Sequence, residues 1–373
     1  MNKNKLVVAI GTVVLIGIIV LMLGRQKLRT EKGSNGIVNI GVILPLTGAQ
    51  AQDGNEILNS LSLACDMLNQ KRDEKINLLV ADSKDSPKEA ITAFNKLLQH
   101  DPIAFIIGGS TVAMTIAPLG EKYEVPIIGL LASDEALAKI NEWTFRFFPL
   151  DMGDAATMAK FAKEKLGVKT ASILWVNNTQ GDEFSKYLTK EFERVNGKVL
   201  YSECYDIGAV NLKSEVEKAM SFDVDAIYVF GYGTGFVTCF NTLAQAHYRG
   251  KVLSWAPFSL PFNLAALSQS SEGVYYTAPR FDKSDSATTD YYNRYVKKFS
   301  KVPGYIGAFG YESLLMMSPA LSQGIKSKEL RDYIMGIADY DSIVGRIGFY
   351  GSKGLMIRPS IWKIENGSPR LLQ

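Results

Sequence analysis

Cysteine and histidine are scarce in this chain, which has three cysteines and two histidines in 373 residues. Cys65, Cys204 and Cys239 form an odd and widely spaced set, which excludes a disulfide framework and a clustered zinc site. Cys65 and Cys239 lie in apolar helical patterns, so we expect both to be buried. His100 and His247 share no motif with the cysteines, and we expect them at the surface or at helix ends. We therefore expect neither a metal nor a cofactor.

Motifs of catalysis and of nucleotide binding are also lacking. The chain contains no G-x-S-x-G nucleophile elbow, and neither histidine follows a predicted strand, so nothing indicates a Ser-His-Asp hydrolase. It contains no G-x-x-x-x-G-K-[ST] phosphate loop either. We assign no catalytic residues and expect that the protein is not an enzyme.

Charge of either sign is nearly balanced outside the N-terminus. Residues 1–36 hold six of the 41 Lys and Arg residues and one of the 38 acids. The remaining residues therefore carry 35 basic and 37 acidic side chains, a formal charge of −2. Such a body gives no electrostatic argument for binding nucleic acid.

One long hydrophobic run is present, at residues 6–24, with nineteen uncharged and almost wholly apolar residues after Lys3 and Lys5. At ~1.5 Å per residue the run nearly crosses the ~30 Å core of a bilayer. No small-x-small cleavage site and no cysteine for lipid attachment follows it. We predict a signal anchor with a linker to residue 36, and a cleaved signal sequence is the alternative. Basic residues flank the run on both sides, so the positive-inside rule does not decide its orientation.

The body of the chain alternates strand and helix patterns. Apolar runs predict strands at 37–44, 76–82, 104–109, 125–130, 171–176, 198–205, 225–230 and 252–257. The segment TFRFFPL at 144–150 ends the first block of alternating elements. Helical spacing predicts helices at 56–70, 86–99, 154–166, 182–195, 211–220 and 236–247, and a short one ending at Gly120. This alternation indicates an α/β fold with two doubly wound parallel sheets covered by helices. The tail, residues 345–372, indicates antiparallel strands joined at Gly351–Gly354.

The segment DAIYVFGYGTGF, residues 225–236, runs from a strand into alternating glycines. A dinucleotide loop needs G-x-G-x-x-G and an acid about 20 residues later. Here the spacing is G-x-G-x-G, and no acid occurs from Val252 to Ser271. We prefer the interpretation that the glycines form a turn that brings Tyr232 to the lip of a crevice. A nucleotide-dependent oxidoreductase remains a third hypothesis for the function.

Polar and aromatic residues follow other predicted strands in the same way. Ser110 and Thr111 follow one strand, Ser133 another, Gln180 a third and Trp255 a fourth. Capping of the next helix would explain Ser110, and Ser133 with its neighbour Asp134, and each of the others is ordinary in a loop. Ligands of open α/β sheets bind beyond the carboxyl ends of the strands, so their joint placement predicts a shared cleft.

The ordered set of segments resembles the type I periplasmic binding proteins, in the leucine-binding-like branch of ABC transporter receptors for branched-chain amino acids and amides. The resemblance begins with NIGVILPLTGAQAQDGNEILNSLSLACDMLN and VADSKDSPKEAITAFNKLL. It continues through FIIGGSTVAMTIAP, VPIIGLLASDEAL, WTFRFFPLD, VDAIYVFGYGTG, AFGYESLLMM and GRIGFYGSKG. It covers about residues 37–370.

The resemblance implies two Rossmann-like lobes joined by three hinge crossings, with a small ligand in the cleft between them. The implied first lobe comprises residues 37–149 and 278–335, and the second comprises 150–277 and 336–373. By position, Ser110 and Thr111 match the hydroxyls that hold a ligand carboxylate. Ser133 matches a further polar position, and Tyr232 matches a contact aromatic of the second lobe.

Departures from the family pattern bear on the ligand. Asp53 and Gln180 stand where an aromatic residue is common, and SWAPF at residues 254–258 lacks the acid that usually pairs with a ligand ammonium. A buried ammonium without a partner is costly, so Asp53 is a candidate replacement. An amide, an aromatic acid or another small carboxylate is at least as good a candidate as a branched-chain amino acid, with Trp255 as a wall of the site.

The family implies an extracytoplasmic solute-binding receptor of an ABC importer, whose lobes close on the ligand and are read by a permease. Residues 6–24 would anchor it to the inner membrane, or the protein would be secreted after cleavage. A membrane-anchored envelope sensor or scaffold of the same fold, without a role in transport, is the alternative.

Overall fold

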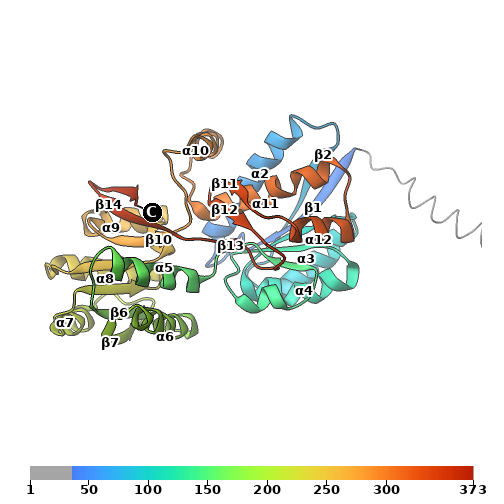
Figure 1. The fold of residues 1–373 in the computed structure, drawn as a ribbon. Coiled ribbons are helices and arrows are strands. Elements are labelled where there is room, and N and C mark those ends of the chain that lie inside the picture. Colours follow the sequence, from blue (N-terminus) through green and yellow to red (C-terminus); the bar gives the residue numbers. More distant parts are fainter. Residues whose placement is uncertain (1–35, 373) are drawn as a thin grey trace, which may run out of the picture.

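The structure is a computed structural model that describes residues 36–372, so the predicted anchor at residues 6–24 lies outside the described residues. Within residues 36–372, no helix has both the length and the apolar character needed to span a bilayer. Two groups of elements lie side by side, with α2, α3, α4, α11 and α12 in one and α5–α8 in the other (Figure 1).

The first sheet is five-stranded and wholly parallel. Its order is β2-β1-β3-β4-β5. The strands are β1 (Ile37–Leu44), β2 (Lys75–Asp82), β3 (Phe105–Gly108), β4 (Ile127–Leu130) and β5 (Thr144–Arg146). Side chains of successive strand residues point to opposite faces, and the core divides accordingly. Ile106 packs in the cluster with α2 (Ala51–Asn69) and α11 (Tyr305–Ser322), whereas Ile107 packs with α3 (Pro87–Leu98) and α4 (Ser110–Tyr123).

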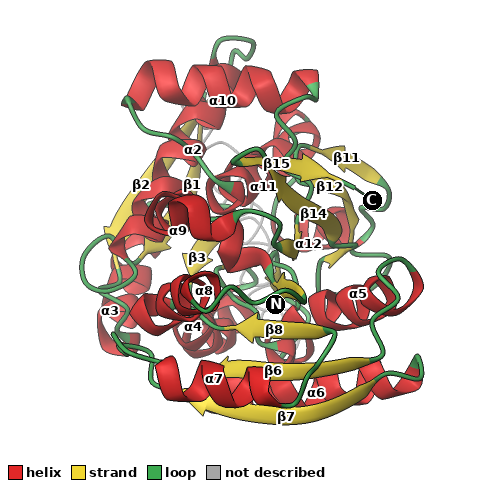
Figure 2. Ribbon diagram, turned by 90° about the vertical axis from the view of Figure 1, so that its left-hand side faces the viewer, coloured by secondary structure: helices red, strands yellow, loops and turns green. Residues whose placement is uncertain are grey.

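The second sheet repeats this winding and adds a hairpin. Its order is β15-β14-β10-β9-β8-β6-β7. The parallel strands are β6 (Thr170–Val176), β7 (Lys198–Tyr205), β8 (Ala226–Phe230), β9 (Lys251–Ser254) and β10 (Tyr275–Ala278). The strands β14 (Ser360–Glu365) and β15 (Ser368–Leu371) are antiparallel to their neighbours. Figure 2 shows β6, β7 and β8 side by side.

The helices of the second group precede or connect these parallel strands. They are α5 (Asp151–Glu164), α6 (Thr179–Arg194), α7 (Lys213–Ser221), α8 (Gly233–Gln245) and α9 (Pro261–Leu267). The pairs α5–α6 and α7–α8 pack together. The ring of Phe184 in α6 stacks on Phe230 at the end of β8, with ring centroids 3.6 Å apart. The predicted doubly wound organisation is therefore confirmed in both sheets.

Three segments carry the chain between the sheets. The first, residues 147–150, follows β5. The second, residues 279–285, leads from β10 to α10 (Ser286–Phe299), which packs on α2 through the hydrogen bond from Asn59 to Tyr295, 3.2 Å long. The third, residues 358–359, leads back to β14.

Residues 336–373 were predicted to form one part of the second lobe. Their strands instead pair in two different sheets. The small sheet of β11 (Tyr340–Ser342), β12 (Gly345–Gly348) and β13 (Met356–Ile357) follows α12 (Ser327–Met335) and lies against the first group. The amide of Arg146 in β5 donates to Lys353 over 2.8 Å, and the ring centroids of Phe145 and Phe349 are 5.3 Å apart. Only β14 and β15 join the second sheet. The predicted boundary at residue 336 is therefore corrected to about residue 358, because the backbone of residues 353–355 pairs with β5.

The expected strands all occur, and the predicted antiparallel pair in the tail is confirmed as β12 and β13. Helix α2 begins at Ala51, five residues before the predicted start. The sequence patterns set no bounds for α11, which is buried on nearly every side and so lacks an amphipathic period. Cys65 and Cys239 are buried and both histidines are exposed, as predicted.

Candidate functional site

The seven predicted site residues all lie just beyond the carboxyl ends of parallel strands. In the first sheet Asp53 follows β1, Ser110 and Thr111 follow β3, and Ser133 follows β4. In the second, Gln180 follows β6, Tyr232 follows β8 and Trp255 follows β9. Because these strands are adjacent and parallel, the structure brings the two sets to one edge of each sheet.

Each set lies at the point where the strand order reverses. In the first sheet the chain passes from β1 to its outer neighbour β2, and from β3 in the opposite direction to β4. In the second sheet the chain passes from β6 to β7 and from β8 in the opposite direction to β9, so β6 and β8 are the equivalent pair. Asp53 and Ser110 flank the first of these switch points, and Gln180 and Tyr232 flank the second. The loops leave a switch point in opposite directions, which opens the crevice where α/β proteins bind ligands.

Ser110 and Thr111 open α4 without capping it. The N-cap residue is Gly109, at φ +94°, and no side chain accepts the amides of the first turn. The interpretation of Ser110 as the cap of its own helix is therefore wrong. Ser110 is half-buried and Thr111 exposed, and neither hydroxyl hydrogen-bonds to any other residue within 36–372. Free amides and hydroxyls at a helix N-terminus form a site suited to a carboxylate.

Ser133 lies between β4 and the short 3-10 helix Glu135–Lys139. The carboxylate of Asp134 caps that helix, because it accepts the amide of Ala136 over 2.8 Å. The capping interpretation thus holds for Asp134. The half-buried Ser133 hydroxyl has no hydrogen bond within the described part of the chain, so it is available to a ligand.

Asp53 is a half-buried acid in the first turn of α2. Burial raises the pKa of its carboxyl group to about 6. Glu56, one turn later, has a structural role, since its carboxylate accepts the amides of Gly304 (2.9 Å) and Gly307 (2.7 Å) at the start of α11. Within residues 36–372 the side chain of Asp53 makes no hydrogen bond or ion pair, so its charge is uncompensated there.

Tyr232 is held across the second switch point by Asn178. The side-chain oxygen of Asn178 accepts the amide of Gly181 over 2.8 Å and so caps α6. Its side-chain nitrogen donates to the Tyr232 hydroxyl over 2.7 Å. Asn178 was not among the site residues predicted from the sequence. The position of Asn178 before a predicted helix could have indicated an N-cap, whereas its hydrogen bond to Tyr232, 54 positions away, could not be read from the sequence.

Trp255 was predicted to form a wall of the site, but its side chain is buried in the second lobe. It is 4% exposed, and its indole N–H donates to the carbonyl of Gly231 over 2.9 Å. Its ring packs on Phe230, with centroids 4.0 Å apart. The reason is hydrophobic burial, because the aromatic core at the ends of β8 and β9 covers the indole. Trp255 therefore supports the turn that carries Tyr232.

The glycines of residues 231–235 shape this turn. Gly231 has φ +146° and Gly233 φ +79°, in the region that side chains avoid. A Cβ on Gly231 would also collide with the Tyr205 hydroxyl. The predicted turn role of these glycines is confirmed. Along residues 36–372, no group of His, Cys, Asp and Glu side chains has the arrangement of a metal site.

Comparisons with known proteins agree with this architecture. A profile of the periplasmic binding proteins matches residues 37–362. The Leu/Ile/Val-binding protein homolog 3 of Brucella melitensis biotype 1 is 22% identical over 201 residues, 52% of this chain and 54% of that protein. The alignment therefore spans about half the length of this curated relative.

Solved structures show the same fold at low identity. The branched-chain amino acid transporter substrate binding protein of Streptococcus pneumoniae, in complex with isoleucine, superposes with a TM-score of 0.78 at 18% identity. That match covers 90% of this chain and 99% of the other. A solute binding protein of Rhodopseudomonas palustris, in complex with 3,4-dihydroxybenzoic acid, gives a TM-score of 0.76 at 18% identity, over 90% and 95% of the two chains. The chain belongs to the type I periplasmic binding proteins, in the family of the branched-chain amino acid receptors.

Proposed function

We propose that this protein is an extracytoplasmic solute-binding receptor that captures a small carboxylate-bearing ligand between its two lobes and delivers it to an ABC permease. The observation that carries the proposal is the first switch point. There the uncapped N-terminus of α4, with the hydroxyls of Ser110 and Thr111, and the half-buried acid Asp53 flank one switch point. An anion site beside a carboxylate suits a molecule with charges of both signs.

In this proposal Ser110, Thr111 and Ser133 bind the ligand carboxylate in the first lobe. Asp53 faces the ligand ammonium in place of the acid that the family carries near residues 254–258. The protein then favours an amino acid over a plain aromatic acid or amide, because an ionised Asp53 repels a ligand that has only negative charge. Fold likeness to receptors of isoleucine and of 3,4-dihydroxybenzoic acid is compatible with either ligand class.

Closure of the lobes would bring Tyr232 and Gln180 over the bound ligand. Asn178 and Trp255 position Tyr232 by their hydrogen bonds to its hydroxyl and to the preceding carbonyl. The moving bodies are residues 37–146 with 286–357, and residues 151–278 with 360–371, joined by the three crossings. Hinge closure of this kind buries the ligand and presents a changed surface to a partner.

We further propose a periplasmic location, with residues 6–24 as the inner-membrane anchor or as a signal sequence. If residues 6–24 stay uncleaved as an anchor, this favours one alternative function, a fixed envelope sensor or scaffold without transport. A protein that co-purifies while the cleft is empty would support that alternative.

Calorimetry on the full chain with isoleucine and with 3,4-dihydroxybenzoic acid tests the proposal. We expect at least one probe to bind. The double substitution Ser110→Ala and Thr111→Val should weaken its binding at least tenfold, because charge-assisted hydrogen bonds contribute about 1.5–3 kcal/mol each.

The matched control is Thr92→Ala, which removes an exposed helix hydroxyl that donates to its own helix at Lys88. It should leave the dissociation constant unchanged. Equal affinity of the double variant and the original chain would contradict the proposed carboxylate site.

A further inference from the structure

A hollow of about 930 Å³ lies where the three crossing segments meet. We call it the hinge hollow. Its lining includes Leu150 from the first crossing, Arg280 from the second and Arg358 from the third. None of the seven candidate cleft residues lines it, so it is separate from the proposed ligand site. Its volume lies in the range of ~300–1,000 Å³ that is usual for small-molecule sites.

Positive charge predominates in the hinge hollow. Five of its lining side chains are cationic and two are acidic: Lys139, Arg146, Arg280, Arg346 and Arg358 against Glu135 and Asp339. Glu135 is already paired with Lys139, at 2.6 Å. The buried Arg146 guanidinium donates to the carbonyls of Phe148 and Leu355.

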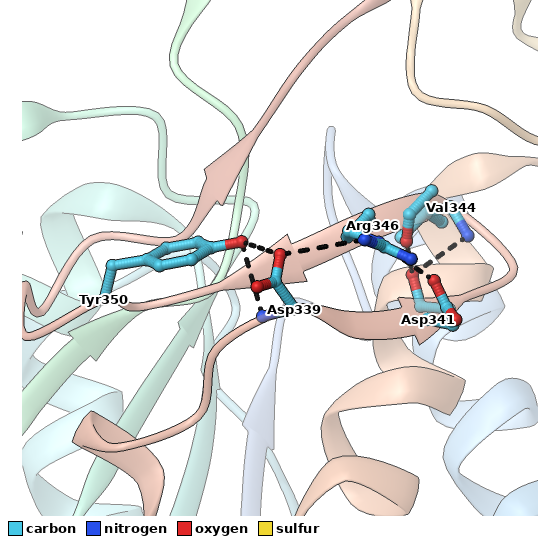
Figure 3. A network of polar contacts seen from close by, with 7 residues as sticks. Asp339, Asp341, Val344, Arg346 and Tyr350 are labelled. Carbon is cyan, nitrogen blue, oxygen red and sulfur yellow. Dashed lines mark hydrogen bonds and ion pairs between the residues drawn. The ribbon is translucent and has the colours of Figure 1, made fainter.

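The remaining acid belongs to a network around Arg346 (Figure 3). Asp339 accepts the Tyr350 hydroxyl over 2.7 Å and lies 4.0 Å from the Arg346 guanidinium. Arg346 also pairs with Asp341 at 3.2 Å, so its charge is compensated. With Lys139, Arg146 and Arg346 engaged in these contacts, Arg280 and Arg358 are the two lining cations that remain.

Arg280 and Arg358 are both exposed, and neither lies within 4.0 Å of an acid in residues 36–372. Asp285 is near enough to Arg280 for the guanidinium charge to contribute to the lowered pKa of the Asp285 carboxyl group. A guanidinium presents donors in a planar fork that matches the oxygens of a phosphate group, and it stays charged at every physiological pH. Two such groups line the same hollow and together attract anions to it.

We propose that the hinge hollow binds a small molecule carrying a phosphate group, recognised by Arg280 and Arg358. Because the lining comes from all three crossings, the bound molecule contacts both bodies of the hinge. A ligand that fits one hinge arrangement better than another shifts the protein toward it. The hollow is thus a second site, through which a phosphate compound biases the opening of the lobes.

Inorganic phosphate is the first probe, added to the full chain and compared with chloride at matched ionic strength. We expect phosphate to bind in calorimetry and to raise the melting temperature. The double substitution Arg280→Gln and Arg358→Gln should weaken phosphate binding at least fivefold, and each single substitution by less. Arg249→Gln, at an exposed arginine after α8 that does not line the hollow, should change nothing.

The proposal would be overturned if the double variant bound phosphate as well as the original chain does. It would also be overturned if neither protein bound phosphate. The source of the phosphate is distinguished by two competitors of bound inorganic phosphate. Stronger competition by glycerol 3-phosphate indicates a soluble phosphomonoester, and stronger competition by glycerophosphoglycerol indicates a lipid headgroup. Either result supports a phosphate site, whereas competition by neither contradicts it.

Discussion

At the scale of single residues, the most informative side chain is Asp53. Charged carboxylates are rarely left half-buried without a partner, because desolvation penalises the ionised form. Here burial raises the pKa of Asp53 to about 6, and no partner within the described residues offsets it. The same residue decides between two ligand classes, since an ammonium favours its charged form and a second anion favours its neutral form.

The pH dependence of binding should therefore have opposite signs for the two ligand classes. Isoleucine should bind more weakly as pH falls through about 6, by up to tenfold per unit, because its ammonium requires ionised Asp53. A plain carboxylate such as 3,4-dihydroxybenzoic acid should bind more tightly over the same fall. Calorimetry between pH 5 and pH 8 measures both trends.

The control is Asp53→Asn, which should remove the step near pH 6 for either probe. An identical pH profile in this variant would show that Asp53 does not contact the ligand.

At the scale of elements, the two lobes use the same device to place the helix that follows the first strand of each sheet. A Cβ on Gly54 in α2 would collide with the carbonyl of Pro45, and one on Gly181 in α6 would collide with that of Val176. Only glycine permits this close approach of helix and strand end. The residues just before these glycines, Asp53 and Gln180, reach equivalent positions in the two lobes as a result.

Substitution of either glycine by alanine should destabilise the protein. Gly54→Ala and Gly181→Ala should each lower the free energy of unfolding by about 1–3 kcal/mol, because a rigid backbone carbonyl blocks the added methyl group. Chemical denaturation measures the effect. Gly208→Ala is the matched control, since nothing lies within 4 Å of its Cβ position, and it should change little.

If both variants unfold like the control, the helices are free to shift, and the placement of Asp53 and Gln180 does not depend on these contacts.

At the scale of the whole molecule, one buried acid holds the β11–β12 hairpin, which precedes the return of the chain to the second sheet. Glu312 in α11 is 2% exposed and accepts the amide of Ile343 over 2.8 Å and the Tyr340 hydroxyl over 3.1 Å. It thereby holds the β11–β12 hairpin against the first group of elements. Burial raises the pKa of Glu312 to about 7.

This raised pKa predicts how stability varies with pH. The folded protein binds the proton more tightly than the unfolded chain, so the contribution is present below the ordinary value of 4.5 and is lost as pH rises toward about 7. Across this window the loss should reach about 3 kcal/mol. Urea denaturation at several pH values should show a flatter profile for Glu312→Gln than for the original chain.

Glu329 in α12 is exposed, so the substitution Glu329→Gln serves as the control and should retain the dependence of stability on pH of the original chain. A slope that survives in Glu312→Gln would assign the pH dependence to another group.

The sequence by itself determined the α/β class, the double winding and the strand ends that carry the candidate site. These follow from apolar runs, helical periods and turn residues, which are local properties of the chain. It also placed Ser110, Thr111, Ser133 and Tyr232 beyond the carboxyl ends of their strands, where the structure has them.

Only the tertiary structure decided the rest. It placed β11–β13 against the first sheet, covered Trp255 with aromatic side chains and joined Asn178 to Tyr232. It also gathered Arg280 and Arg358, 78 positions apart, around one hollow. Each of these outcomes depends on which surfaces pack between residues distant in the chain, and no local pattern of residues encodes that choice.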